Sequence, residues 1–434
     1  MMTELSKRGF MRNRSVHGGP LPVRDNRLTL GGRSADELAR EFGTPLYVYD
    51  EALIRARCGD LRDSFRGARP DFHYAVKANF NPALLRIVKE EGFGIDAVSP
   101  HEVRLALELG FRPEQILFTG NNVSEEDLAF CVQRAVPVNL GSLDELDRYG
   151  RLNPGGTVSL RINPDVGAGH HQHVITGGPH SKFGMYVTDR ENLGAVLARH
   201  RLRLCGLHAH IGSGILRTDD MLTAMESVLK EADHYEGLEF IDFGGGFGIP
   251  YRPEEKRLAL AELGSAMSER FLEFGRRYGR PLRMKLEPGR YVMAEAGTLL
   301  ARVTAVKATP RHTFVGTDSG FNHLVRPAMY GAYHRIVNAS RVEGEARPVV
   351  VAGNICESGD VFTQGEHGLE DRPLTLPQVG DVLAILDAGA YGMCQSSQYN
   401  LRPRPPEVLV NGKEARLIRR RESYEDLMRN FEGL

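Results

Sequence analysis

Short apolar runs alternate with amphipathic stretches from about residue 46 to about residue 307. The short runs are typical of buried strands, and the stretches between them place apolar residues at the spacing of one helix face. Strand and helix therefore alternate about eight times over a region of the length that a barrel needs. The predicted strands are Tyr74–Val76, Gly94–Val98, Ile116–Thr119, Val136–Asn139, Val158–Ile162, Cys205–Ala209, Phe240–Phe243 and Met284–Glu287.

Polar residues mark the start of several predicted helices. One helix is expected near Pro82, and the spacing of a capping box occurs three times, at Ser99 with Glu102, Ser124 with Asp127 and Ser142 with Glu145. Repeated β–α units predict an α/β fold, either a TIM-type (β/α)8 barrel over 46–307 or a doubly wound open sheet. The repeat of about eight units points to the barrel, but periodicity alone does not separate the barrel from the open sheet.

The chain changes character after about residue 308. Helical patterns become scarce, and apolar runs typical of strands follow at Val349–Val351, Val382–Leu386 and Val408–Val410. We therefore predict a second, mainly β domain over residues 308–434, together with residues 20–45. Residues 1–19 are expected to be a flexible terminus.

Composition narrows the function. The 434 residues include 55 basic and 56 acidic side chains, for a net charge of -1, so no excess of positive charge exists for a dedicated nucleic-acid binder. No apolar run reaches the ~18 residues of a membrane helix, and the first twenty residues lack the apolar centre of a secretory signal. Five cysteines without a CxxC pair indicate reduced thiols and a cytoplasmic protein.

Chemically active residues follow the predicted strands, at the end where barrel enzymes build their sites. Glycines in the loop after the seventh strand would let backbone N–H groups approach a phosphate. The candidates are Lys77 after the first strand, His210 and Ser213 after the sixth, Gly244, Gly245 and Gly246 after the seventh, and Glu287, Gly289 and Arg290 at the eighth.

Each candidate has an ordinary explanation when taken alone. A single lysine is normally a surface residue, although the apolar run before Lys77 predicts a place beside a core, where desolvation lowers a lysine pKa. The histidines His170, His171 and His173 resemble a metal tract but lack a matching Cys or carboxylate pattern, so we expect no metal. Together, a nucleophilic lysine, a phosphate cradle, a ring-sized aromatic partner and a carboxylate describe a pyridoxal phosphate site.

The motifs of the chain resemble those of the fold-type III pyridoxal-phosphate decarboxylases, and within them the diaminopimelate decarboxylases. The resemblance runs from about residue 46 to about residue 421. It implies a barrel plus a β domain, as in alanine racemase-like folds. The matching motifs are YAVKAN (74–79), FGIDAVSPHE (93–102), HIGSG (210–214), GGGFGIPY (244–251), EPGR (287–290), RPAMYGAYH (326–334), CESGD (356–360), GAYG (389–392) and SQYNLRPRPPEVL (397–409).

The resemblance implies a role for each matching residue around the cofactor. Lys77 would hold pyridoxal phosphate as a Schiff base, His210 would stack on its ring and Glu287 would pair with the ring nitrogen. A carboxylate there favours a protonated ring and hence decarboxylation, whereas an arginine would favour racemisation. The residues expected to hold or surround the phosphate are Ser213, Gly244, Gly245, Gly246, Gly289, Arg290 and Tyr391.

The substrate would meet a second group of residues. Cys356 and Glu357 would reach in from the other subunit of a homodimer, because the family's sites form at that interface. Cys356 is the preferred proton donor to the substrate carbanion, with Lys77 second, and Glu357 would bind the distal ammonium group. The residues expected to contact substrate carboxylates or lie close to them are Arg290, Arg326, Tyr330 and Tyr391.

The activity that the resemblance implies is decarboxylation of meso-2,6-diaminopimelate to L-lysine and CO2, the last step of lysine biosynthesis. Polyamine-forming relatives typically carry aspartate where Glu357 stands, which favours this substrate. An ornithine- or arginine-type decarboxylase and a non-catalytic pyridoxal-phosphate-binding protein remain the alternatives. The chain departs from the family at Gly214, where glutamine is frequent, and at Asn354, where proline is frequent.

Overall fold

A computed structural model describes residues 21–163, 181–186, 190–365 and 368–433 of the chain. These residues divide into two compact units. One comprises the described residues up to Ile54, Tyr251–Glu255 and the residues from Met293 onward; the other comprises Arg55–Pro250 and Lys256–Val292. The histidines at 170, 171 and 173 and the terminus at 1–19 lie outside the described residues.

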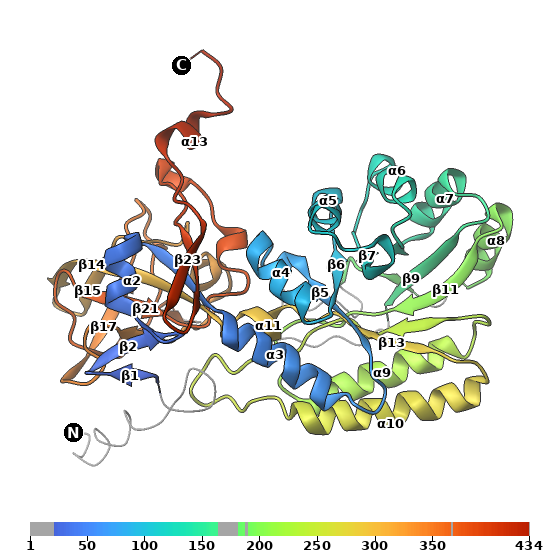
Figure 1. Cartoon of the computed structure of the whole chain (residues 1–434), viewed down its shortest axis with the longest axis horizontal. Helices are drawn as coiled ribbons and strands as arrows, with labels where there is room; N and C mark the ends of the chain where they lie inside the picture. The colour runs from blue at the N-terminus through green and yellow to red at the C-terminus, as the bar shows by residue number, and fades with distance from the viewer. Residues whose placement is uncertain (1–20, 164–180, 187–189, 366–367, 434) are drawn as a thin grey trace. The chain divides into compact units, whose positions relative to one another are not determined.

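The second unit is built on eight parallel strands, one at each of the eight predicted positions. Each is a short apolar segment, and most of their residues are buried. Figure 1 shows α6, α7 and α8 on one side of these strands and α9 and α10 on the opposite side. The strands are β5 (Asp71–Ala75), β6 (Gly94–Ala97), β7 (Ile116–Phe118), β8 (Asn139–Leu140), β9 (Thr157–Asn163), β11 (Arg203–His208), β12 (Phe240–Asp242) and β13 (Arg283–Leu286).

These strands close into a barrel. The last strand, β13, pairs in parallel with the first, β5, and β7 reaches the residue before β8 through the parallel bridge between Phe118 and Val138. Strand β8 in turn pairs with β9, so every strand of the ring has two neighbours. This closure confirms the barrel over the doubly wound open sheet, because an open sheet leaves two unpaired edges. A short strand, β10 (Met185–Tyr186), pairs with the end of β9.

The helices of the barrel begin where the polar residues predict. Ser99, Ser124 and Ser142 each accept a hydrogen bond from the backbone N–H three residues later, which satisfies a donor that the first helical turn leaves unpaired. The helices are α3 (Glu51–Ser64, which crosses the division between the units), α4 (Pro82–Glu90), α5 (Pro100–Glu108), α6 (Glu125–Gln133), α7 (Leu143–Leu152), α8 (Arg190–His200), α9 (Thr218–Ala232), α10 (Leu260–Tyr278) and α11 (Arg290–Met293).

The first unit is mainly β. Its largest sheet has the order β20–β17–β15–β14–β4–β22–β23, and β21 pairs with both β14 and β16. Apolar side chains of this sheet form a core with those of a helix, α2 (Ala35–Phe42). The strands are β4 (Leu46–Asp50), β14 (Gly297–Ala308), β15 (Thr313–Thr317), β16 (Ile336–Asn338), β17 (Ala346–Ala352), β20 (Arg372–Thr375), β21 (Val382–Ile385), β22 (Glu407–Asn411) and β23 (Glu414–Arg419).

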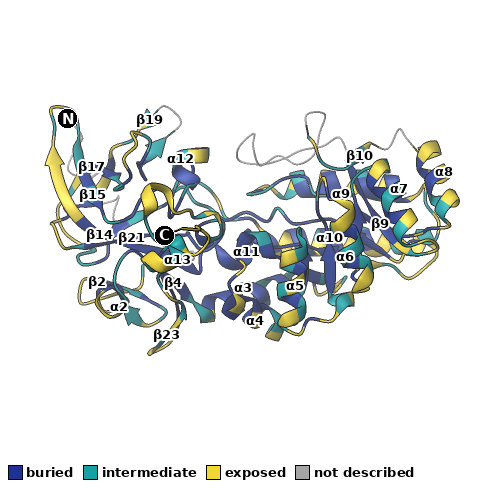
Figure 2. Cartoon of the chain, turned by 90° about the horizontal axis from the view of Figure 1, so that it is seen from above, coloured by how far each residue is buried: buried dark blue, intermediate teal, exposed yellow. Residues whose placement is uncertain are grey.

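Small elements complete this unit. The three predicted strands after residue 308 lie in β17, β21 and β22, and the predicted segments Val349–Val351, Val382–Leu386 and Val408–Val410 are buried (Figure 2). Strand β4 and the first part of β14 pair with each other, so Leu46–Asp50 and Gly297–Ala308 belong to this sheet and not to the barrel. The remaining elements are β1 (Val23–Arg24), β2 (Arg27–Leu30), β3 (Arg33–Ser34), α12 (Arg326–Tyr330), β18 (Gln364–Gly365), β19 (Gly368–Leu369) and α13 (Tyr424–Met428).

Among the described residues, no helix combines the length and the apolar character that crossing a lipid bilayer requires. All five cysteines lie within the described ranges, and none of them forms a disulfide.

Candidate functional site

Lys77 lies just past the carboxyl end of β5, in the short 3-10 turn Val76–Ala78. Its Nζ is 2.7 Å from Oδ2 of Asp96, at the neighbouring strand β6, and the lysine side chain is 37% exposed. The sequence predicted an amine controlled by desolvation. The structure instead pairs it with a buried carboxylate, and an opposite charge at this distance favours the charged amine.

Asp96 is the buried partner of this lysine. Its Oδ1 also accepts a hydrogen bond from the Thr119 hydroxyl, at the end of β7. Burial raises the pKa of Asp96, the charge of Glu287 raises it further, and Lys77 and the hydrogen bonds lower it. Lys77 is therefore held at the barrel end by a carboxylate that has its own fixed support.

The glycine loop after β12 fixes His210. The backbone N–H of Gly245 donates to Nδ1 of His210 at 2.9 Å, so that nitrogen carries no proton. Burial lowers the pKa of His210 well below its usual value, with Lys77 and Arg161 adding to the effect. The ring is therefore neutral. A neutral, flat ring suits a side chain that stacks on an aromatic group.

Glycine is required in this loop for space and for backbone conformation. A Cβ on Gly245 would lie 2.2 Å from the carbonyl oxygen of Glu287, and one on Gly244 would lie 2.6 Å from that of Ala209. Gly244 and Gly246 also have φ angles of 68° and 101°, which favour glycine. The loop thus packs directly against the backbone beneath it and leaves its outer side without side chains.

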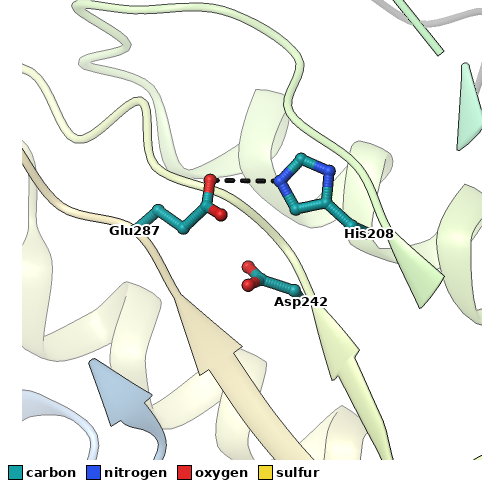
Figure 3. Close-up of side chains that lie close together, drawn as sticks. All are labelled: His208, Asp242 and Glu287. Atoms are coloured by element: carbon teal, nitrogen blue, oxygen red, sulfur yellow. Dashed lines mark hydrogen bonds and ion pairs between the residues drawn. The ribbon is translucent and has the colours of Figure 1, made fainter. Parts of the chain in front are cut away.

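Glu287 follows β13 and belongs to a buried group of three ionisable residues with His208 and Asp242 (Figure 3). Oε2 of Glu287 is 3.1 Å from Nε2 of His208. Burial raises the pKa of Glu287, but His208, Lys77 and His210 together hold it well below its usual range. Glu287 is therefore a buried carboxylate that stays ionised.

Arg290 begins α11 and reaches a loop from another strand. Its Nη2 and Nε donate to the Ser213 hydroxyl at 3.0 and 3.2 Å. Gly289, just before it, packs against the turn that carries Lys77, because a Cβ there would lie 3.0 Å from Cβ of Ala78. The barrel unit thus brings together all of the predicted residues that it contains: Lys77, His210, Ser213, Gly244, Gly245, Gly246, Glu287, Gly289 and Arg290.

Four polar residues inside this barrel were not predicted from the sequence. Asp96, His208 and Asp242 lie within or directly beside motifs that were recognised, and Arg161 lies in β9 with its guanidinium 4.4 Å from the ring of Phe183. The sequence did contain a signal for them: a charged residue within an apolar strand is rarely buried without a function. Their partners, however, come from other strands, which periodicity does not reveal.

The β unit carries the remaining predicted residues. Arg326 starts α12 and is 2% exposed. Its Nη1 is 2.9 Å from Nε2 of His334, whose Nδ1 is 2.9 Å from the carbonyl oxygen of Leu386. The guanidinium also lies 4.6 Å from the ring centre of Tyr251. Arg326 is therefore a buried cation held in one orientation by an imidazole and an aromatic ring.

Cys356 and Glu357 differ from Arg326 because both are exposed. The backbone N–H of Cys356 donates to Oδ1 of Asn400 at 2.8 Å, which fixes the loop but leaves the thiol at the surface. The hydroxyl of Tyr330 is 3.5 Å from Nε2 of Gln395, and Tyr391 has a φ of 57°.

The two departures from the family pattern have structural correlates. Gly214 has a φ of 76°, a conformation that glutamine rarely adopts. Asn354 donates its backbone N–H to the carbonyl oxygen of Ser319 at 3.0 Å, a bond that proline could not make. In both places the residue present suits its backbone.

Comparison with known proteins agrees with this arrangement. Residues 51–294 match the family model described as "Pyridoxal-dependent decarboxylase, pyridoxal binding domain". A diaminopimelate decarboxylase of Methanothermobacter thermautotrophicus is 47% identical over 416 residues, which cover 93% of this chain and 95% of that protein. One of Streptomyces coelicolor is 41% identical over 92% of each chain.

Solved structures extend the similarity to the fold of nearly the whole chain. A diaminopimelate decarboxylase from M. jannaschii matches with a TM-score of 0.86 and 34% identity, over 95% of this chain and 97% of that one. The enzyme from Helicobacter pylori, complexed with L-lysine, matches with a TM-score of 0.83 and 32% identity, over 91% and 98%. The chain therefore belongs to the pyridoxal-dependent decarboxylase family and, within it, to the diaminopimelate decarboxylases.

Proposed function

We propose that this protein decarboxylates meso-2,6-diaminopimelate to L-lysine and CO2 with pyridoxal phosphate as its cofactor, as the last step of lysine biosynthesis. The observation that carries the chemistry is Glu287, a buried carboxylate held ionised beneath the glycine loop. The substrate is supported by relatives named for this reaction at 41–47% identity and by the lysine complex of the Helicobacter pylori enzyme.

The residues present fit the cofactor. Oε1 of Glu287 is buried and has no hydrogen-bond partner within the described part of the chain, so it suits a protonated ring nitrogen. In the loop Gly244–Gly246, the N–H groups of Gly244 and Gly245 bond to Asp242 and His210. Gly246 contributes a backbone N–H, and Ser213 and Arg290 add a hydroxyl and a cation. These donors suit a phosphate group, and we assign Gly289 and Tyr391 to the same group by their family motifs.

Each barrel residue then has a defined task. Bound pyridoxal phosphate supplies an electron-accepting ring that takes up the electron pair left when the carboxylate departs. Lys77 provides the primary amine that anchors the cofactor, and Asp96 holds that amine at the end of the barrel. His210 presents a neutral ring for stacking, and Glu287 keeps a negative charge at the ring nitrogen.

The β unit completes the substrate site in this proposal. The guanidinium of Arg326 would bind a substrate carboxylate, because an arginine fork matches a carboxylate in geometry and charge. We assign Arg290, Tyr330 and Tyr391 to the same task. Glu357 would pair with the distal ammonium group, and the thiol of Cys356 would return a proton to the substrate carbon. General acid catalysis of this kind contributes about 10²–10⁴-fold.

We further propose that the enzyme is a homodimer of the cytoplasm. The exposure of both Cys356 and Glu357 supports a dimer in which each subunit lends these residues to its partner, since catalytic groups act best away from water. The five cysteines, none of which forms a disulfide, support a reducing compartment.

The direct test is incubation of the purified protein with pyridoxal phosphate and meso-diaminopimelate, followed by measurement of CO2 and L-lysine. We expect stoichiometric CO2 and L-lysine, and little turnover of ornithine or arginine in parallel assays. Faster turnover of ornithine or arginine would identify a basic amino acid decarboxylase. Cofactor binding without turnover of any of the three would indicate a non-catalytic protein.

A further inference from the structure

Three ionisable side chains meet beneath the glycine loop, at the carboxyl ends of three consecutive barrel strands. His208 ends β11, Asp242 ends β12 and is its partner in register, and Glu287 directly follows β13. The residues are 1%, 0% and 3% exposed, and one candidate ligand atom from each lies within 4.8 Å of the others (Figure 3). The strand register places His208 beside Asp242, and the backbone that follows β13 brings Glu287 to the same end of the barrel.

The hydrogen bonds within this group divide the oxygens of Glu287 into two kinds. Oε2 is engaged by Nε2 of His208, whereas Oε1 has no partner in the described residues. Asp242 does not compete for His208 through Oδ1, which accepts the backbone N–H of Gly244 at 2.8 Å. The group thus leaves one carboxylate oxygen of Glu287 available while it fixes the other.

The charges of the three residues also favour an ionised Glu287. Two buried carboxylates at this separation cannot both ionise without a nearby cation or proton. Burial and the charge of Glu287 raise the pKa of Asp242 to about 7, while His208 lowers it. Asp242 therefore takes up a proton more readily than an exposed carboxyl does, which leaves Glu287 as the ionised carboxylate of the group.

We propose that His208 is a positioning residue for Glu287: it holds Oε2 and thereby fixes Oε1 as the acceptor for the protonated ring nitrogen of the cofactor. Asp242 ties the group to the glycine loop by accepting the backbone N–H of Gly244. This inference rests on the proposed function, because it assigns a role toward the cofactor of that reaction. It adds a residue that acts through Glu287 and does not itself touch the substrate.

The test measures cofactor binding and not activity. Dissociation constants are determined for the full-length apoprotein with pyridoxal phosphate and with its 1-deaza analogue, in which a carbon replaces the ring nitrogen. We expect the wild type to bind pyridoxal phosphate about tenfold or more tightly than the analogue, the usual effect of a hydrogen bond to a charged group. The ratio of the two constants isolates the contact with the ring nitrogen from all other contacts.

Substitutions at His208 then show whether its hydrogen bond to Glu287, or only its size, affects the ratio. In His208→Leu and His208→Asn no donor remains at the position of Nε2, and we expect the ratio to fall to within about threefold of one. His208→Gln keeps a donor at that position and serves as the matched control, with a ratio close to that of the wild type. His208→Asn decides the question where His208→Leu does not fold, because its amide keeps the site polar.

The outcomes distinguish this inference from the function on which it rests. A folded His208→Asn protein with the wild-type ratio would overturn the positioning role of His208 while leaving Glu287 in place. A wild type that binds both compounds equally would remove Glu287 from the ring nitrogen and count against the proposed decarboxylation. In a Glu287→Gln background, where the ratio should already be close to one, His208→Asn should have no further effect on it.

Discussion

The barrel unit and the β unit hold their chemically active residues in different ways. In the barrel, Lys77, His210 and Glu287 are each tied by hydrogen bonds to residues of another strand or loop. In the β unit, Arg326 is buried and held by His334, but the side chains of Cys356 and Glu357 lie at the surface.

The difference matches two tasks of an active site, which are to hold a cofactor and to act on a substrate. A cofactor that stays bound benefits from a preorganised, buried set of donors and charges, because little reorganisation is then needed. A proton donor and a substrate-binding carboxylate need exclusion of water only when the substrate is present. In the proposed function, the barrel residues of one chain hold the cofactor, whereas Cys356 and Glu357 act in the site of a second subunit.

The largest expected effect tests the barrel side of this comparison. Lys77→Ala removes the only nitrogen that we assign as cofactor anchor, so we expect loss of the visible absorbance of the bound cofactor and a fall in kcat of at least about 10³-fold. Absorbance spectra and steady-state assays measure both. Lys230→Ala, an exposed lysine on α9, is the matched control and should behave as the wild type. A retained visible band in Lys77→Ala would assign the anchor to another residue.

Strand positions could be predicted from the sequence because each barrel strand is an apolar segment between helix signals. The candidate site residues at the strand ends could then be predicted too, since the carboxyl ends of parallel strands share one side of the barrel. The contacts of Asp96 and His208 could not be predicted, because strand register and side-chain rotamers decide them. The boundary near residue 46 failed for a similar reason: Leu46–Asp50 is as apolar as a barrel strand, but it pairs with β14 and β22.

The second prediction concerns the buried cation of the β unit. Arg326→Ala removes a fork that we expect to bind a substrate carboxylate, so kcat/KM for meso-diaminopimelate should fall about 10²-fold, mostly through KM. Inhibition by L-lysine should weaken as well, whereas inhibition by cadaverine, which has no carboxylate, should change little. Arg326→Lys, which keeps charge but loses the fork, should lie between. Equal weakening of both inhibitors would place the carboxylate site elsewhere.

The third prediction tests whether the exposed residues of the β unit act in a partner. Equal amounts of inactive Lys77→Ala and Cys356→Ala proteins are mixed under conditions that allow subunits to exchange. Half of the dimers should be hybrids with one intact site each, so about a quarter of wild-type activity should return. Mass spectrometry of labelled subunits verifies the exchange. Exchange without recovered activity would mean that Lys77 and Cys356 serve the same site from one chain.

The smallest effect concerns stability in the barrel. Glu102, at the start of α5, accepts the backbone N–H of Val98 at 2.7 Å, and burial raises its pKa to about 7, with that hydrogen bond opposing and the charge of Asp96 assisting. Because the folded value exceeds the unfolded one, the folded state binds more protons between the two values. The stabilisation that results is complete below the unfolded value and is lost as the pH rises through 7.

Glu102→Gln removes this titration while keeping an oxygen acceptor for Val98. The free energy of unfolding of the wild type should therefore fall relative to that of the variant between pH 5 and pH 8, by about 2 kcal/mol. Urea titrations of both proteins at the two pH values measure the difference, and Glu108→Gln, an exposed glutamate on the same helix, is the matched control. Parallel pH profiles for wild type and Glu102→Gln would show that the carboxyl of Glu102 titrates in the folded state as it does in water. The charge of Asp96, beside Lys77, would then have no effect on its pKa.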